Sequence, residues 1–296
     1  MKNGFRYIFY ASLIFLLVAL IRADYLVLPV IHNYWKLTLS LLLLFLGFFL
    51  NAASWGFMVR QGEKQIPLKD TIVSHGLSIF TKYIPGKVWI IMGRAEYLAK
   101  KYSLSRKDMA SLSLDAQLVA LWAALMLGTI GMIWIKSINL YGLSVLILFL
   151  ILNLLIFTPL LHRITGRVLT RLLKREITFP RLSFSGLLRI IGWYGLNWGT
   201  WCVAFYFLTG SLVEEPLPFP IAFAFGLAGS IGIMAVFAPG GLGVREGILT
   251  GFLTLAGVDL PVATTIAVTS RLWFLAGELF IFLLAVVLRP RNAREG

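Results

Sequence analysis

The sequence Ala238-Pro-Gly-Gly-Leu-Gly-Val-Arg-Glu-Gly247 interrupts an otherwise apolar region near the end of this 296-residue chain. Its glycines permit a tight turn at backbone angles that other residues avoid. Apolar runs lie on both sides of it, Pro220–Phe237 before the turn and Gly243–Ala256 after it. The second run has fourteen residues, and as a helix it reaches only about 21 Å, less than the ~30 Å hydrocarbon core of a bilayer. The pattern predicts a re-entrant helical hairpin, which enters a membrane and leaves it on the same side.

Composition places the whole chain in a membrane. Hydrophobic residues make up 59% of it and charged residues 14%, against about 45–50% and about 25% in soluble domains. These values exclude a water-soluble enzyme, a disordered tail and a secreted module built on disulfides. The one cysteine, Cys202, excludes a disulfide framework and a cysteine-based metal site.

Seven apolar runs have lengths near the roughly 20 residues that a spanning helix needs. They are Phe5–Ile21, Trp35–Phe57, Leu112–Ile135, Leu140–Leu161, Leu187–Leu208, Pro220–Phe237 and Pro261–Leu288. No small-residue cleavage site follows the first run, so we interpret it as an anchored helix and not as a signal peptide. We expect six of the runs to span the membrane fully, with Pro220–Phe237 as one arm of the hairpin.

The basic residues set the orientation. The net charge is +14, and the loops Arg60–Ser111 and His162–Arg189 each carry an excess of six positive charges, while the loops between them sum to zero. The positive-inside rule places both basic loops and both termini in the cytoplasm. We therefore expect a multi-pass protein of the cytoplasmic (inner) membrane and no nucleic-acid partner. Binding of anionic lipid by these loops is an alternative to a purely topological role.

A second interrupted stretch, Asp70–Leu98, breaks at Pro85-Gly86-Lys87. The orientation puts both of its ends in the cytoplasm, so we predict a hairpin that opens inward, opposite to the other one. A loop and a long apolar helix follow each hairpin. The predicted fold is all-α, a polytopic integral membrane protein with two re-entrant helical hairpins in an inverted repeat. One domain covers 1–296, with its first repeat at about 70–135 and its second at about 219–288.

Charged residues inside the apolar segments are the candidate functional residues, because a charge in a bilayer costs at least about 2.5–3.5 kcal/mol on insertion scales. Lys87 and Arg245 each stand at the start of a returning helix, where the helix dipole is positive. Two such helix starts meeting near the midplane would suit a phosphate or another anion. The predicted substrate-binding residues are Lys87, Arg94, Gly240, Gly241, Arg245, Glu246 and Arg271, with Pro85, Gly86 and Pro239 forming the turns.

Alternatives remain for several of these residues. Arg245 and Glu246 can instead belong to a packing hairpin, paired with each other or with neighbours. Lys82 and Arg94 can instead extend to the cytoplasmic surface.

Two embedded acids, Asp115 and Glu278, have two open interpretations. They carry protons or ions, or they pair with the arginines at positions 94, 245 and 271. Arg271 and Glu278 are seven residues apart and therefore share one face of a helix.

Other sequence patterns give no evidence of a functional site. Gly243, Gly247 and Gly251 form a stripe that close helix packing explains. The three histidines lack the spacing of metal ligands, and no nucleotide-binding loop or catalytic motif is present. We expect no metal and no cofactor, and we do not expect an enzyme.

The run Pro239-Gly-Gly-Leu-Gly-Val-Arg-Glu246, followed by Ala263 and Arg271, resembles the lysylphosphatidylglycerol synthase transmembrane (flippase-like) family. Ile84-Pro-Gly-Lys-Val88, with Arg94, Leu98 and Ala110, is similar to the other hallmark of that family. The resemblance implies a protein of the type that moves lipids between leaflets. It implies a stand-alone form without the aminoacyltransferase domain, because the chain ends at Gly296, and synthase activity does not carry over. Asp115 stands where the family places a Glu, which leaves the role of that position open.

Three functions are therefore in view. The first is a lipid translocase (flippase) for an anionic phospholipid or a polyprenyl-phosphate lipid, with the head group near the midplane and the tails in lipid. The second is an ion- or proton-coupled transporter of a small anionic solute, using Asp115 or Glu278. The third is a non-catalytic membrane partner of a lipid-modifying enzyme or glycosyltransferase.

Overall fold

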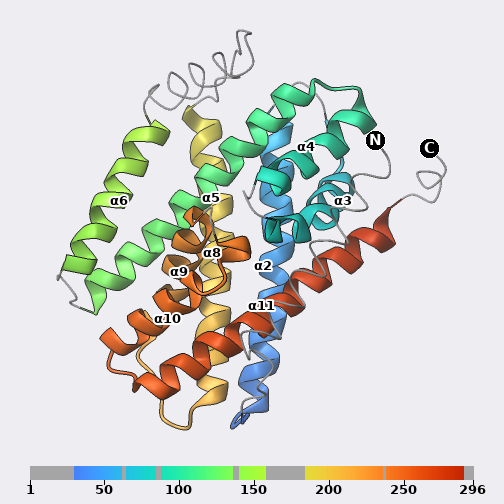
Figure 1. Cartoon of the computed structure of the whole chain (residues 1–296). Coiled ribbons are helices and arrows are strands. Elements are labelled where there is room, and N and C mark those ends of the chain that lie inside the picture. Colours follow the sequence, from blue (N-terminus) through green and yellow to red (C-terminus); the bar gives the residue numbers. More distant parts are fainter. Residues whose placement is uncertain are drawn as a thin grey trace.

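The computed structural model describes residues 30–61, 65–84, 88–135, 140–157, 184–235 and 238–289. Within these ranges the regular structure is entirely helical and contains no strand, which confirms the all-α prediction (Figure 1). The elements are α2 (Tyr34–Arg60), α3 (Leu68–Ser78), the 3-10 helix η1 (Ile79–Tyr83), α4 (Val88–Tyr102), α5 (Arg106–Trp134), α6 (Leu140–Phe157), α8 (Phe184–Leu212), the 3-10 helix η2 (Phe219–Phe223), α9 (Ala224–Met234), the 3-10 helix η3 (Pro239–Gly241), α10 (Val244–Leu255) and α11 (Leu260–Leu288).

Several predicted features lie outside the described residues. They are the first apolar run, Phe5–Ile21, the turn Pro85-Gly86-Lys87 and most of the basic loop His162–Arg189.

Three of the described helices are long and apolar enough to cross a membrane: α2, α5 and α11. They cover the predicted spans Trp35–Phe57, Leu112–Ile135 and Pro261–Leu288, except that α5 ends at Trp134, one residue before the predicted end. Shorter apolar helices cover Gly142–Leu154 and Phe219–Met234. This confirms a membrane protein with several apolar helices.

The helix α8 has 29 residues, as α5 does, but it is not among the three candidate spans. Polar and aromatic residues make it less apolar, and some of them face α2. The Asn197 amide donates to the Gly47 carbonyl oxygen at 2.8 Å and accepts from the Asn51 amide at 3.0 Å. Gly47 also admits Trp201, since a Cβ atom there would lie 2.3 Å from the indole ring. The pair α2–α8 is therefore held by polar and aromatic contacts as well as by apolar packing.

The remaining helices fall into two similar series. In one series α3, η1 and α4 precede the long helix α5, and in the other α9, η3 and α10 precede the long helix α11. The helices α3 and α9 have 11 residues each, and α5 and α11 have 29 each. In Figure 1 the two long helices follow similar diagonals in opposite directions.

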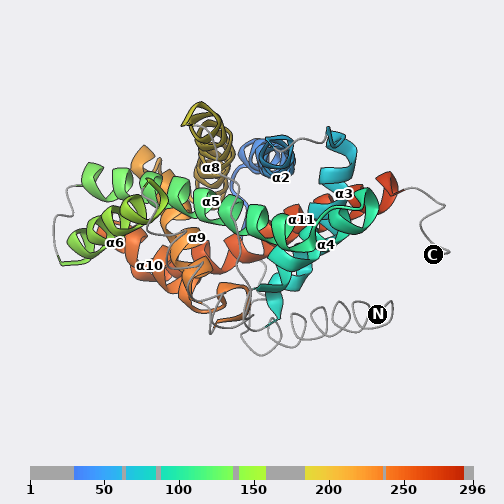
Figure 2. The ribbon, with the colours of Figure 1, turned by 90° about the horizontal axis from the view of Figure 1, so that it is seen from above.

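The two series pack against each other through exchanged contacts: the long helix of each series contacts a short helix of the other. The helix α5 contacts α4 of its own series and α9 of the other, and α11 contacts α10 of its own series and α3 of the other. Seen from above, α2 and α8 lie on one side of α5, and α9 and α10 lie on the other (Figure 2). The helix α6 packs on α5 at the edge of the molecule.

Glycines permit both exchanged contacts. A Cβ atom on Gly128 of α5 would lie 2.7 Å from the Leu227 Cβ of α9, and one on Gly76 of α3 would lie 2.4 Å from the Ile281 carbonyl oxygen of α11. Small residues allow helix backbones to approach closely in membranes. Each interface between the series therefore depends on a residue without a side chain.

The stripe Gly243, Gly247 and Gly251 behaves differently. No atom of the described residues lies within 4 Å of a Cβ atom built at any of the three positions. The close packing predicted for this stripe is therefore wrong for the part of the chain that the structure describes.

Candidate functional site

The two series meet where η1 contacts η3. Gly240 in η3 has φ 59° and ψ 13°, a left-handed conformation that glycine adopts without strain. The ring of Tyr83 from η1 lies against it, so closely that a Cβ atom on Gly240 would be 2.4 Å from two ring carbons. Tyr83, two residues before the first predicted turn, thus contacts the second turn directly.

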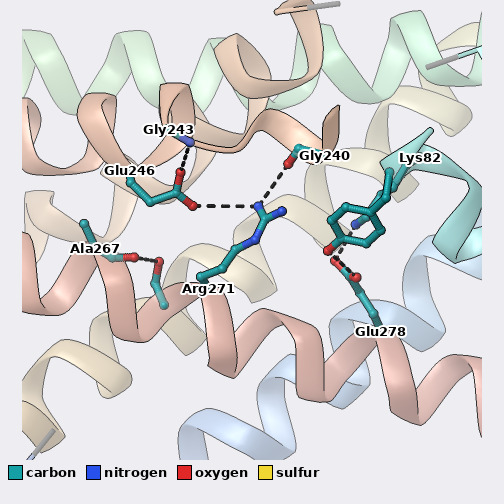
Figure 3. A network of polar contacts seen from close by, with 9 residues as sticks. Lys82, Gly240, Gly243, Glu246, Ala267, Arg271 and Glu278 are labelled. Atoms are coloured by element: carbon teal, nitrogen blue, oxygen red, sulfur yellow. Dashed lines mark hydrogen bonds and ion pairs between the residues drawn. The ribbon is translucent and has the colours of Figure 1, made fainter. Parts of the chain in front are cut away.

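Glu278 of α11 binds the end of η1. Its side chain is buried at 1% exposure. One carboxylate oxygen forms an ion pair with Lys82, and the other accepts a hydrogen bond from the Tyr83 hydroxyl at 2.8 Å (Figure 3). A buried carboxylate is costly unless it is paired and hydrogen-bonded, and these two neighbours supply both interactions. Lys82 therefore does not extend to the surface as its alternative interpretation proposed.

Arg271 of α11 binds the second turn. It lies on the same face of α11 as Glu278. Its Nη1 donates to the Gly240 carbonyl oxygen at 2.9 Å and lies 3.7 Å from the Glu246 Oε1 (Figure 3). The seven-residue spacing therefore puts both side chains toward the turns, as predicted. The charged group of Arg271 contacts η3, and the charged group of Glu278 contacts η1.

Glu246 occupies the start of α10. Its Oε2 accepts a hydrogen bond from the Gly243 backbone N–H at 2.7 Å, as an acid at this position of a helix commonly does. The other oxygen faces Arg271. Glu246 thus pairs with Arg271 and not with the adjacent Arg245, and an internal carboxylate contacts the helix start that was expected to receive an anion.

Arg245 is buried at 6% exposure and has aromatic neighbours. The carbon of its guanidinium group lies 4.5 Å from the centre of the Phe225 ring and 4.6 Å from that of Phe274, within the range of cation–π attraction. No salt bridge to a described carboxylate reaches it, and its Nε and Nη2 have no hydrogen-bond partner among the described residues. Phe274 also lies 5.1 Å from the Lys82 ammonium, so the ring has a cation on two sides.

These five charged residues form the central cluster: Lys82, Glu246, Arg245, Arg271 and Glu278. Three are cations and two are carboxylates. With two ion pairs formed, one positive charge is in excess, and the contacts assign it to Arg245.

Arg94 lies apart from the contacts of this cluster. It is buried at 3% exposure in α4. Its Nε donates to the Ser113 hydroxyl at 2.6 Å, its Nη2 donates to the Ser113 carbonyl oxygen, and its guanidinium carbon lies 4.5 Å from the Trp55 ring centre. These contacts tie α4 to α5 and α2. Asp115 is half-buried on α5, two residues after Ser113.

The other predicted residues belong to the turns. Gly241 is buried and has φ 73°, and its N–H donates to the Ala238 carbonyl oxygen at 2.9 Å. Pro239 begins η3. Lys87, Pro85 and Gly86 lie outside the described residues.

Sequence reasoning left the role of Lys82 open and missed three residues of the site: Tyr83, Phe225 and Phe274. The need of a buried Glu278 for a counter-charge was a signal for Lys82, three residues before Pro85. Nothing in the sequence distinguishes Phe225 and Phe274 from ordinary core residues, because an apolar helix contains many of them.

The model of one protein family, described as the lysylphosphatidylglycerol synthase TM region, matches residues 6–286 of the chain. The match contains both helical series and all five residues of the central cluster. A comparison with curated proteins finds no match.

Proposed function

The chain belongs to the family of lysylphosphatidylglycerol synthase TM regions, and from this premise we propose that it is a lipid translocase. It moves an anionic or phosphate-containing lipid between the leaflets of the cytoplasmic membrane. The head group binds near the midplane, and the tails stay in lipid.

The architecture that we propose is an inverted repeat of two re-entrant hairpins. One hairpin comprises α3, η1 and α4, and the other comprises η2, α9, η3 and α10. The matched lengths of the elements, the opposite directions of α5 and α11 and the exchanged packing support it. Transporters place their substrate at the interface of such repeats, at interrupted helices near the midplane.

The single observation that carries the proposal is that Arg245 has no ion pair with a carboxylate among the described residues. An arginine that is buried without a carboxylate is costly unless an anion joins it. We expect the head group to lie beside the turn at Gly240 and Gly241 and beside the pair Glu246–Arg271 as well.

The net charge of the head group suggests the membrane potential as the energy source of transport. A membrane potential supplies about 2.3 kcal/mol per elementary charge per 100 mV. A head group with a net charge is therefore driven without nucleotide hydrolysis, and the sequence contains no nucleotide-binding loop.

Proteoliposomes test the proposal. The purified full chain is reconstituted with fluorescent phosphatidylglycerol, and the fraction of label that an external quencher reaches is followed with time. We expect exchange between leaflets at least ten times faster than in empty vesicles, and a loss of most of that gain with Arg245→Ala. The matched control is Arg106→Ala, because Arg106 is an arginine whose side chain is 60% exposed. If Arg245→Ala is as fast as the wild type, the proposal is wrong.

A second candidate is an ion- or proton-coupled transporter of a small anionic solute. The buried carboxylate of Glu278, with its single lysine partner, favours this candidate. Uptake of a labelled soluble anion that depends on a proton gradient, with no lipid exchange, would replace the first candidate with the second.

A further inference from the structure

The two unpartnered nitrogens of Arg245 lie on one edge of its guanidinium group. In arginine the Nε–H and the Nη2–H point in nearly the same direction and form a fork, which fits two oxygens of one phosphate or carboxylate. Both are buried, and neither has a hydrogen-bond partner among the described residues. The rings of Phe225 and Phe274 lie against the same guanidinium group and restrict its movement. Arg245 thus presents an ordered pair of donors without an acceptor.

The carboxylates of the central cluster already have partners. Glu246 accepts from the Gly243 N–H and faces Arg271, and Glu278 accepts from Lys82 and Tyr83. Neither acid is therefore left to neutralise Arg245 without breaking a pair. Since no acceptor among the described residues reaches the fork, we take a bound group to supply it.

The excess of one positive charge limits the charge of that group. A phosphodiester carries one negative charge and brings the central cluster to neutrality. A phosphomonoester carries about −1.5 to −2 at neutral pH and would leave negative charge in a site of low dielectric constant, which is unfavourable.

We propose that the Nε and Nη2 edge of Arg245 binds the two non-bridging oxygens of one phosphodiester group, and that the central cluster selects this group over a phosphomonoester. The inference rests on the proposed function and adds to it the chemical class that the site accepts. Arg245 is the specificity-determining residue, and the pairs Lys82–Glu278 and Arg271–Glu246 hold the charge balance that makes the selection.

Binding to the purified full chain tests this without transport. Radiolabelled dioleoyl phosphatidylglycerol is titrated into the protein in an uncharged detergent at pH 8, and unlabelled competitors displace it. We expect dioleoyl phosphatidic acid, a monoester, to compete at least tenfold more weakly than phosphatidylglycerol. Equal competition by phosphatidic acid would overturn the proposal.

A change of pH provides an internal control on the wild-type chain. The second pKa of a phosphomonoester is about 6, so phosphatidic acid becomes singly charged at pH 5.5. The preference for the diester over the monoester should then fall to less than threefold. A preference that stays the same at both pH values contradicts a selection by charge.

The variant Arg245→Lys separates the fork from the charge. Lysine keeps one positive charge but offers no paired edge, so we expect at least a tenfold weaker affinity for phosphatidylglycerol. Arg106→Lys is the matched control and should bind as the wild type does, since Arg106 is exposed. Wild-type affinity in Arg245→Lys overturns the proposal. If that variant does not fold, the competition and the pH series on the wild type still decide the question.

Two further comparisons separate this inference from the proposed function. Diethyl phosphate, a soluble diester, distinguishes a lipid head group from a free phosphate ester. Competition by it as strong as that of the lipid supports the fork and identifies a soluble ligand. Selective binding without lipid exchange supports this inference and contradicts the proposed translocase. Lipid exchange together with binding that does not depend on Arg245 supports the translocase and contradicts this inference.

Discussion

Arg245 and Glu246 are neighbours in the sequence but have different partners in the structure. Glu246 faces Arg271 and the Gly243 N–H, while Arg245 lies against two aromatic rings. Consecutive residues of a helix do not face each other, so an Arg-Glu pair in the sequence is not an ion pair on a helix. This separation leaves one cation of the central cluster available for a ligand.

The pair Lys82–Glu278 is expected to show strong coupling. Glu278→Gln leaves Lys82, whose side chain is only 21% exposed, without its counter-charge and should lower the free energy of unfolding by about 3–5 kcal/mol. The double variant with Lys82→Met should cost less than the sum of the two single variants, with a coupling energy of about 1–3 kcal/mol. Unfolding in mixed micelles measures all four proteins, and additive effects would show that the two residues do not form an ion pair.

Gly240 and Gly247 should respond to alanine in opposite directions. At Gly240 the left-handed backbone and the Tyr83 ring, 2.4 Å from a new Cβ atom, make Gly240→Ala destabilising by at least about 2 kcal/mol. At Gly247, inside α10 with open space around it, alanine should stabilise by roughly 0.5–1 kcal/mol. Thermal unfolding of the two variants compares them directly, and equal shifts would contradict the described turn.

Individual helices were predictable where they are long and apolar. The predicted runs Trp35–Phe57 and Pro261–Leu288 fall inside α2 and α11, and Leu112–Ile135 falls inside α5 except for Ile135, the residue that caps its C-terminal end. The actual helices extend beyond the apolar runs because caps and not hydropathy end them: Asn33 accepts from the Lys36 N–H at 2.9 Å, and Ser105 accepts from the Asp108 N–H at 3.3 Å.

Packing between helices was less predictable. The stripe of Gly243, Gly247 and Gly251 has the spacing of a packing motif, but the described residues make no close approach there. The close approaches occur at Gly128 and Gly76, which no motif marks. Spacing shows that glycines share a helix face, but it does not show whether another helix lies on that face.

The two exchanged interfaces should be equally sensitive to added volume. Gly128→Ala places a Cβ atom 2.7 Å from Leu227, and Gly76→Ala places one 2.4 Å from the Ile281 carbonyl oxygen. Each should lower stability by about 1–3 kcal/mol. Gly192→Ala on α8 has no atom within 4 Å and serves as the control. Unfolding midpoints that match between Gly128→Ala and the control would contradict the α5–α9 contact.

The molecule as a whole brings two series of helices together at one small site. The helix α11 binds η3 through Arg271 and η1 through Glu278, so it links the turn of its own series to the other series. A rearrangement that separates η1 from η3 therefore has to break a contact of α11. If the chain is the proposed translocase, the central cluster lies where its two halves would move against each other.

The orientation of the molecule can be measured with single cysteines. Cys202 is buried at 1% exposure, so the wild-type chain should give little labelling. A membrane-impermeant maleimide should label Glu215→Cys in intact cells and Lys100→Cys only after the cells are opened, since both residues are exposed and we expect the basic side to face the cytoplasm. The reverse pattern would contradict the orientation of the proposed translocase.

The sequence by itself determined that this protein is helical, that it lies in a membrane and which of its charges are embedded. Hydropathy and charge are sums over neighbouring residues, so they need no knowledge of how helices pack. The tertiary structure decided the pairing. Lys82 and Glu278 are 196 positions apart, and whether they meet depends on the rotation and crossing of helices. Because those geometric choices commit Glu246 and Glu278 to other partners, the Nε and Nη2 of Arg245 keep no acceptor among the described residues.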